Sequence, residues 1–385
     1  MSNNDKQLKP LIVDFGSSTT KIGWAGDDAP KIIAPSIYVD VRDYIFNSDI
    51  IDGLEDIFIK DNKNIEKHFF GNEALYYQNI LKVHEFIKEK NYNILLKFFF
   101  SYYQQLDIEP KNQFKQPIIF ITPFIVTDLE KAKLQQLFFK FFKFPLILFL
   151  PESQAILSTL QKTSGVIVNM SESNTYISTI FHGFTNIMAR DIFPIAGNEL
   201  TNNFLNLVLT EKGSGRNLYL NKILAKEIKE KTALCVLNPK LEEKKIKEGL
   251  KKYNQVINFP DGSSLEINSE RFMITEPLFD PSLIHIDYIS LDQAIANVIK
   301  TWDRENWEEL LSSIILSGGG SLIPGLKERL EKALEKHFPE KLKNKLKVIA
   351  VEDRENMGWI GASILYSRDQ LKKGWIQNPE FEPNI

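Results

Sequence analysis

Short apolar runs alternate with amphipathic stretches in the first half of the chain. Residues 117–124 are apolar throughout, as in a strand that is covered on both faces of its sheet. Asp128 is expected to cap a helix over residues 129–142, and a second strand follows at residues 146–150. This strand–helix–strand order predicts two parallel strands joined by a right-handed crossover.

The segment between residues 40 and 106 carries a less regular pattern. Residues 40–66 hold many charges and little periodicity, which predicts a loop. Residues 74–106 place apolar side chains three and four positions apart, which predicts a helix throughout. Further on, the aromatic-rich residues 138–144 are interpreted as the buried end of a helix, with Lys140 and Lys143 reaching water.

A polar turn follows the first apolar strand of the chain, at residues 11–24. Its glycine can adopt a positive φ and expose backbone N–H groups, and its two serines add hydroxyl donors. A lysine adds a cation, and an aspartate offers an oxygen suited to hydrated Mg²⁺. The turn residues alone are typical of an ordinary hairpin, but the combination predicts a phosphate site. The residues of this site are Asp14, Gly16, Ser17, Ser18 and Lys21.

The composition is that of a globular protein with two domains. The chain has 385 residues, of which 43% are hydrophobic and 25% charged, enough for a large core. Its net charge of −3 gives no general attraction to nucleic acid, so no direct nucleic-acid contact is expected. Cys235 is the single cysteine, the N-terminal residues lack the apolar core of a signal peptide, and no apolar run approaches the roughly 20 residues of a membrane helix. We therefore expect an intracellular protein with no disulfide and no membrane span.

Five motifs, in order along the chain, resemble those of the actin and actin-related protein family. WAGDDAPKIIAPSI directly follows the polar turn. The others are SQAILS with Gln154, KEIKEK with Lys229 and Glu230, LSGGGSLIPG at residues 316–325, and WIGASIL at residues 359–365. The resemblance implies an α/β, actin-like two-domain fold with a mixed five-stranded sheet in each domain. This fold is shared by actin, hexokinase and heat-shock chaperone ATPases.

The resemblance also implies where the domains begin and end. The first domain is expected at residues 1–158, with a mobile small subdomain at about residues 40–90. The second is expected at residues 159–357, with an outer subdomain at about residues 199–270, and residues 358–385 return to the first domain as a C-terminal helix. In the family the small subdomain contacts neighbours in a filament. Residues 40–66 look longer here, which fits either a customised contact or a tolerated surface insertion.

By the resemblance, ATP or ADP with Mg²⁺ binds in the cleft between the domains. Asp14 is the implied metal ligand, through water, and Gln154 is the implied catalytic residue, because the matching glutamine positions the attacking water. Taken alone, the later motifs also fit a helix start, a solvated helix or a strand-to-helix connection. The implied nucleotide-binding residues are Asp14, Gly16, Ser17, Ser18, Lys21, Gly197, Lys229, Glu230, Gly318 and Gly319.

Residues 165–180 depart from the second phosphate hairpin of the family. That hairpin has an aspartate after its first strand, glycines around a second acidic residue, and a histidine on the returning strand. Here Asn169 lacks the negative charge that would hold Mg²⁺, and Ser171 and Ser173 stand where backbone must approach phosphate closely. Tyr176 cannot relay a proton at neutral pH as imidazole does. We therefore expect weak or no hydrolysis, and an enzyme is not the favoured interpretation.

The preferred hypothesis is a divergent actin-related protein that forms no filament of its own. It would be a structural subunit of a cytoplasmic, cytoskeletal assembly, such as a ciliary or motor complex, and its partners would be other protein subunits, among them actin or actin-related proteins. The alternatives are a conventional polymerising actin-like ATPase and an actin-related subunit of a nuclear chromatin-remodelling complex. A sugar kinase or chaperone ATPase shares the fold, but AGDDAPK and WIGASIL argue against it.

Overall fold

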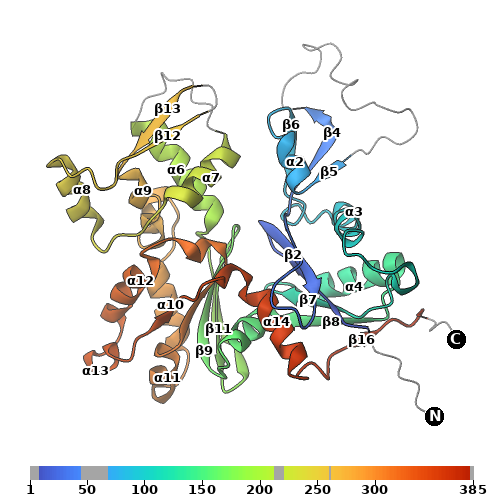
Figure 1. Ribbon diagram of the computed structural model, residues 1–385. Coiled ribbons are helices and arrows are strands. Elements are labelled where there is room, and N and C mark those ends of the chain that lie inside the picture. The colour runs from blue at the N-terminus through green and yellow to red at the C-terminus, as the bar shows by residue number, and fades with distance from the viewer. Residues whose placement is uncertain (1–7, 45–67, 212–220, 260–261, 382–385) are drawn as a thin grey trace. The chain divides into compact units, whose positions relative to one another are not determined.

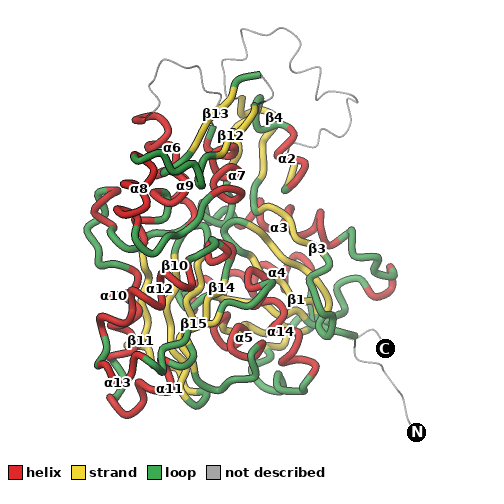
Figure 2. Tube along the Cα trace, turned by 60° about the vertical axis from the view of Figure 1, so that its left-hand side comes forward, coloured by secondary structure: helices red, strands yellow, loops and turns green. Residues whose placement is uncertain are grey.

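Helices and strands alternate along the chain, as expected for the α/β class, which is confirmed (Figures 1 and 2). The computed structural model describes residues 8–44, 68–211, 221–259 and 262–381. No helix of these residues combines the length and apolar character needed to cross a bilayer.

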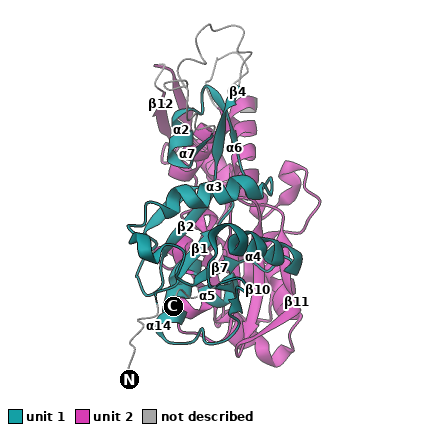
Figure 3. Cartoon of the chain, turned by 90° about the vertical axis from the view of Figure 1, so that its right-hand side faces the viewer, with its two compact units in different colours: residues 1–155, 358–385 teal, residues 156–357 magenta. Residues whose placement is uncertain are grey.

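The chain divides into two compact units (Figure 3). Residues 1–155 and 358–385 make the first unit, and residues 156–357 make the second. The boundary expected at residue 158 lies on the same helix as the observed one, α5 (Glu152–Thr159). The segment that returns to the first unit carries most of helix α14 (Met357–Ser367).

A mixed sheet forms the centre of the first unit. Strand β1 pairs in parallel with β7 and antiparallel with β2. The sheet has six strands where five were expected, because the two-residue strand β16 near the C-terminus pairs antiparallel with β8. The order is β16 (Ile376–Gln377), β8 (Leu146–Pro151), β7 (Ile118–Thr122), β1 (Leu11–Phe15), β2 (Thr19–Trp24) and β3 (Ile32–Pro35).

The predicted strand–helix–strand unit is present as β7, α4 (Asp128–Phe142) and β8, with the two strands parallel. The predicted cap is wrong by one residue. Thr127 caps α4 and Asp128 is its first residue, because the Thr127 hydroxyl accepts from the Glu130 N–H while the Glu130 carboxylate accepts from the Thr127 N–H. This reciprocal pair satisfies two of the N–H groups exposed at a helix start.

Aromatic side chains fill one core of the first unit, as residues 138–144 predicted. Phe138, Phe142 and Phe144 are buried and pack against Phe99 of α3 (Tyr92–Tyr103). Phe141 is the exception within the segment, with 58% of its surface exposed. On the other face of the sheet, Trp359 of α14 donates from Nε1 to the carbonyl of Ile12, 3.3 Å away. The WIGASIL motif is thus core packing in the first unit.

Two predictions between residues 40 and 106 are wrong. The expected loop begins as a strand, and the expected single helix is interrupted by another strand. The apolar spacing misled because Leu81 and Phe86 belong to two different clusters, so they do not share one helical face. Residues 45–67, which include most of the predicted loop, lie outside the described residues. The elements present are β4 (Tyr38–Tyr44), β5 (His68–Phe70), α2 (Asn72–Tyr76), β6 (Leu81–His84) and α3; the strands form a separate sheet in the order β5, β4, β6, called here the small sheet.

The second unit contains the expected five-stranded mixed sheet. Strand β9 pairs antiparallel with β10 and parallel with β14. The strand order is β11 (Phe184–Phe193), β10 (Thr175–Phe181), β9 (Gly165–Met170), β14 (Ile314–Ser317) and β15 (Val348–Ile349). The accompanying helices are α10 (Leu291–Lys300), α11 (Trp307–Leu311), α12 (Leu326–Leu334) and α13 (Glu340–Lys343).

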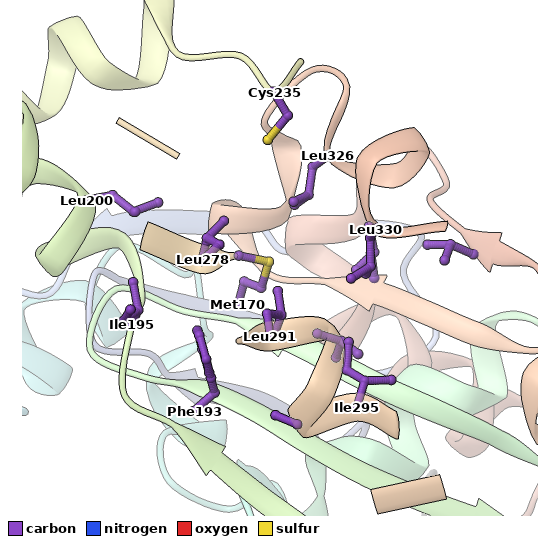
Figure 4. Close-up of a cluster of buried hydrophobic side chains, with 14 of the residues drawn as sticks. Met170, Phe193, Ile195, Leu200, Cys235, Leu278, Leu291, Ile295, Leu326 and Leu330 are labelled. Carbon is purple, nitrogen blue, oxygen red and sulfur yellow. The ribbon is translucent and has the colours of Figure 1, made fainter. Parts of the chain in front are cut away.

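One face of this sheet packs on a large aliphatic core (Figure 4). Met170 of β9 points into it beside Leu278 and Leu291. Burial raises the pKa of Cys235, which lies in the same cluster, to about 12, so this thiol is a core side chain. A further group of elements belongs to the predicted outer subdomain: α6 (Gly197–Glu211), α7 (Lys222–Thr232), α8 (Pro239–Lys247), β12 (Gln255–Asn258), β13 (Ser264–Ile267) and α9 (Glu270–Met273).

Candidate functional site

The predicted phosphate turn of the first unit joins β1 to β2. Its register places Asp14 directly opposite Lys21, and Lys21 Nζ lies 3.4 Å from Asp14 Oδ2. Both side chains keep only 12% of their surface exposed. The base of the turn therefore presents a carboxylate and an ammonium group held together in a partly desolvated place, where charge interactions are stronger than in open water.

Gly16 is needed in this turn for space. A Cβ atom at this position would lie 2.5 Å from the Thr19 carbonyl oxygen. The positive φ that the sequence suggested is not observed, since Gly16 is absent from the positive-φ glycines of the described residues. The prediction of positive φ was therefore wrong. Glycine is required here because a side chain would clash with the Thr19 carbonyl and open the turn.

Ser36, the residue after β3, holds the turn in place through hydrogen bonds. Its hydroxyl donates to the Gly16 carbonyl at 2.7 Å, and its N–H donates to the Ser18 carbonyl at 2.8 Å. A further hydroxyl contact of 2.9 Å joins Ser36 to Thr20. Ser36 lies within the motif that carried the resemblance, but no sequence signal pointed to this role.

Ser17 supplies an observation that bears on ligand binding. Its Oγ is buried and has no hydrogen-bond partner among the described residues. A buried hydroxyl without a partner loses the free energy of its hydrogen bonds to water. A phosphate oxygen at the tip of the turn would accept from this hydroxyl, so the turn fits the phosphate group that the sequence predicts.

The corresponding hairpin of the second unit joins β9 to β10, and its turn bonds to itself. The Ser171 hydroxyl donates to the Asn174 carbonyl at 2.7 Å and accepts from the Asn174 N–H at 3.3 Å. The Ser171 N–H also donates to the Asn174 carbonyl, at 3.1 Å. Ser171 is thus part of the turn, and its hydroxyl is engaged there.

Asn169 lies at the end of β9, opposite Tyr176 in the antiparallel ladder. It is buried, and its neighbour Met170 points into the aliphatic core, so the two side chains face opposite sides of the sheet (Figure 4). The amide is neutral. It offers an oxygen ligand of the kind that Mg²⁺ accepts, but it lacks the charge that would hold the ion firmly.

A glycine turn follows β14 and packs against Asn169. Gly318 has φ +81°, and a Cβ there would lie 2.4 Å from the Met170 carbonyl and 2.5 Å from Asn169 Oδ1. The Gly318 N–H donates to the Arg354 carbonyl at 3.1 Å, while the Arg354 guanidinium donates to the Ser321 carbonyl at 3.0 Å. No sequence signal pointed to Arg354 as the residue that fixes this turn.

The next glycine of that turn has open surroundings. A Cβ atom added to Gly319 would find no atom of its own unit within 4 Å. Backbone without a side chain offers a flat surface that a base or sugar can approach.

Gly197 begins α6 and is closely surrounded. Lys229 Nζ donates to its carbonyl at 2.7 Å, and a Cβ atom at Gly197 would lie 2.4 Å from Glu172 Oε2. Lys226 Nζ lies 3.3 Å from the same Glu172 oxygen. Burial lowers the pKa of Lys229, and the nearby carboxylates of Glu172 and Glu230 oppose this effect.

Gly197 and Lys229 were predicted from the sequence, but the ion pair between Glu172 and Lys226, which joins the hairpin to α7, was not. Two features of the sequence pointed to this pair: an acidic residue in the turn, and a lysine three positions before Lys229.

Each unit thus brings together its own predicted residues. The first unit gathers its five on one hairpin, and it also carries Gln154, whose side chain is exposed on α5. In the second unit Lys229 contacts Gly197, the exposed Glu230 follows it on α7, and the Gly318 turn lies against Asn169.

No cluster of three or more His, Cys, Asp or Glu side chains in the described part of the chain is arranged to hold a metal ion. An ion held by Asp14 would therefore take its other ligands from water and from phosphate oxygens, as Mg²⁺ commonly does.

In a comparison with protein-family models, the family described as Actin matches residues 5–384. The match covers nearly the whole chain, including both hairpins, Gly197 and the glycine turn after β14.

Proposed function

The chain belongs to the actin family, as its motifs predicted, and we propose that it is a divergent, non-filament-forming member that serves as a structural subunit of a larger assembly. In this proposal it binds ATP or ADP with Mg²⁺ and hydrolyses ATP weakly or not at all. The assembly is cytoplasmic and cytoskeletal or motor-associated. Its other protein subunits, actin or actin-related proteins among them, are the partners.

The observation that carries the proposal is the contrast between Asp14 and Asn169. The charged residue stands beside Lys21 in the first hairpin, where the Ser17 hydroxyl is also left for a phosphate. The neutral amide stands at the end of β9 in the second hairpin, opposite Tyr176. Binding needs donors and a metal-holding oxygen, whereas phosphoryl transfer also needs an oriented water and stabilisation of developing charge.

The chain's own residues can therefore hold a nucleotide more readily than they can cleave it. Asp14 would hold the hydrated Mg²⁺, which neutralises phosphate charge, while Ser17, Ser18 and Lys21 donate to phosphate oxygens. Exposed Gln154 remains the residue that could orient a water. A ligand that binds only the folded chain stabilises it by mass action, about 2.7 kcal/mol at a hundredfold excess over the dissociation constant, without turnover.

Binding is tested with Asp14→Ala. We expect its dissociation constant for Mg-ATP, measured by titration calorimetry, to rise at least about tenfold, because the metal-holding charge is lost. The thermal shift that ATP produces should disappear with it. The control is Asp27→Ala, which removes the exposed pair with Lys9, 3.6 Å apart, and should leave binding unchanged. Equal binding by both variants, or no binding by the unmodified chain, would contradict the nucleotide proposal.

Hydrolysis and assembly are tested on the unmodified chain. We expect phosphate release at least about 10²-fold slower than from conventional actin, since a lost charge-orienting group commonly costs this much. Sedimentation under conditions that polymerise actin should leave the chain in the supernatant. Filaments with steady phosphate release would support the polymerising ATPase instead.

The assembly is tested by affinity purification followed by mass spectrometry. Recovery of cytoskeletal or motor subunits supports the proposal, whereas recovery of remodeller ATPases would place the chain with the chromatin complexes.

A further inference from the structure

The second hairpin and the start of α6 are joined by backbone hydrogen bonds within the second unit. The N–H of Gly197 donates to the Ser171 carbonyl at 3.1 Å, and the N–H of Asn198 donates to the Glu172 carbonyl at 2.8 Å. These are two of the N–H groups that a helix leaves without partners at its start, where they could otherwise bind an anion. The chain's own hairpin therefore already uses them.

The side chain of Glu172 adds a charged contact between the hairpin and α7. Its Oε2 lies 3.3 Å from Lys226 Nζ, and only 11% of the Glu172 side chain and 27% of the Lys226 side chain are exposed. The same oxygen lies over Gly197, where a Cβ atom would be 2.4 Å away, so glycine leaves the room that this carboxylate needs. An ion pair that is mostly shielded from water is stronger than an exposed one.

Lys229, three positions further along α7, completes the junction. Its Nζ donates to the Gly197 carbonyl at 2.7 Å, and the Thr201 hydroxyl donates to the same carbonyl at 2.9 Å. Burial lowers the pKa of Lys229, and the charge of Glu172 is the first of the effects that oppose it. The Glu172 carboxylate thus interacts with two lysines of α7 beside the first turn of α6, a setting that favours an anion.

The ion pair of the first hairpin makes no such junction. Asp14 and Lys21 face each other across one ladder, so their contact stays within the hairpin. Glu172 and Lys226 instead belong to elements that are separated in sequence by the whole of α6. The first hairpin offers a ligand the Ser17 hydroxyl, which has no partner among the described residues, whereas the second already holds an anion of the chain itself.

We propose that Glu172 and Lys226 form a ligand-independent brace, which holds the second hairpin against α6 and α7 in the free chain. The carboxylate supplies the negative charge at this junction, so no ligand phosphate is needed to order it. A ligand shifts a conformational equilibrium only as far as it binds the two states differently. The elements that the brace already orders should therefore keep the same arrangement with and without nucleotide.

This inference deepens the proposed function and rests on it in one respect, the response to Mg-ATP. A structural subunit must present the same surface to its partners whatever ligand it holds, and the brace gives α6 and α7 that constancy. The brace itself is a property of the free chain, so it can be tested without nucleotide.

The brace is tested first in the free, full-length chain, by a double-mutant cycle with hydrogen exchange as the readout. Glu172→Gln and Lys226→Met should each increase the opening of residues 165–176 and 222–232 about fivefold, because each breaks a partly buried ion pair. The double variant should open no further than the more open single variant, since the pair is already broken. Effects that multiply in the double variant would overturn the proposal.

Glu227→Gln is the matched control on the same helix. It removes the exposed pair with Lys231, 4.0 Å apart, and should change the opening less than about twofold. Lys226→Arg covers the case in which Lys226→Met does not fold, because it keeps the cation and should retain the protection that Glu172→Gln loses. An equal loss of protection in Lys226→Arg and Glu172→Gln would contradict a brace that depends on charge.

The response to nucleotide is tested by the same measurement with saturating Mg-ATP. In the unmodified chain we expect the exchange of residues 11–24 to slow at least about fivefold, while that of residues 165–176, 197–208 and 222–232 changes less than about twofold. Equal slowing in the two regions would overturn the ligand independence. No slowing at residues 11–24 would instead contradict the nucleotide proposal, and the cycle in the free chain would still decide the brace.

Discussion

The two hairpins of the molecule have the same plan and differ in what they offer a ligand. In the first, the residues that face each other across the ladder are a carboxylate and an ammonium group, Asp14 and Lys21. In the second, they are an amide and a phenol, Asn169 and Tyr176. At the tips, the Ser17 hydroxyl has no partner among the described residues, whereas the Ser171 hydroxyl is bonded within its own turn.

Two turns with the same backbone topology can therefore present different polar groups to a ligand. Both turns are short, and both are tied down from outside: the first by Ser36 and the second by backbone bonds from the start of α6 to Ser171 and Glu172. The two turns differ in whether their polar groups already have hydrogen-bond partners. An unpartnered donor is available for an anion, while a donor already engaged must first break a bond worth about 1 kcal/mol.

The largest effect is expected at Gly318, in the glycine turn that packs against Asn169 of the second hairpin. Gly318→Ala places a methyl group 2.4 Å from the Met170 carbonyl and 2.5 Å from Asn169 Oδ1, at φ +81°. Backbone strain and the displacement of the hairpin together should lower the free energy of unfolding by about 3 kcal/mol. Urea unfolding measures this loss.

Gly183→Ala is the matched control in the same unit. Its φ is +82°, but a Cβ there meets no atom within 4 Å, so only backbone strain of about 1 kcal/mol is expected. Equal losses in the two variants would show that the Gly318 turn does not support the second hairpin.

The next effect concerns the neutral amide of Asn169, and a carboxylate at this position would make the two hairpins more alike. Asn169→Asp restores a carboxylate that can hold Mg²⁺, so affinity for Mg-ATP should rise about tenfold, and without Mg²⁺ it should fall. Hydrolysis should be slow in this variant too, because the phenol of Tyr176 does not relay protons at neutral pH as imidazole does. Titration calorimetry with and without Mg²⁺ provides the measurement.

Asn174→Asp serves as its control, because it adds the same charge to the turn of the same hairpin. A rise of equal size in this control would attribute the effect to net charge and contradict the specific role of position 169.

Much of the fold could be predicted from local patterns. The run at residues 117–124 gave β7 because a strand buried on both faces needs an unbroken apolar sequence, and the aromatic residues 138–144 gave the end of α4. The predicted helix at residues 74–106 failed because spacing alone cannot tell which cluster a side chain joins. Leu81 packs within the small sheet and Phe86 packs in the aromatic core.

The residues of the candidate site also fall into two groups, those that local sequence could predict and those that it could not. The residues of the first turn could be found because their chemistry is concentrated in a few consecutive positions. Ser36 and Arg354 could not be found in that way, since they act over 20 and 33 positions in sequence. Nothing in the local sequence distinguishes Ser36 from any other loop serine, because its role depends on the folded turn between β1 and β2. Likewise, the need for Gly16 was foreseen, but its cause, the nearby Thr19 carbonyl, depended on the register of the hairpin.

The smallest expected effect compares the serine hydroxyls at the tips of the two hairpins, Ser17 and Ser171. Without nucleotide, Ser17→Ala removes a buried hydroxyl that has no partner, so the free energy of unfolding should stay level or rise by about 0.5 to 1 kcal/mol. Ser171→Ala removes the hydroxyl bonded to Asn174 and should lower it by about 1 kcal/mol. Urea unfolding of both variants tests this difference in sign.

Saturating Mg-ATP should reverse the result for Ser17→Ala alone, because the lost hydroxyl is then a lost donor to phosphate, and the variant should be about 1 kcal/mol less stable than the unmodified chain. The Ser171→Ala deficit should keep its size with and without nucleotide, since that hydroxyl already donates within its own turn. If ATP changed the Ser171→Ala deficit as much as that of Ser17→Ala, both tips would contact the ligand, and the contrast between the hairpins would not describe how this chain binds nucleotide.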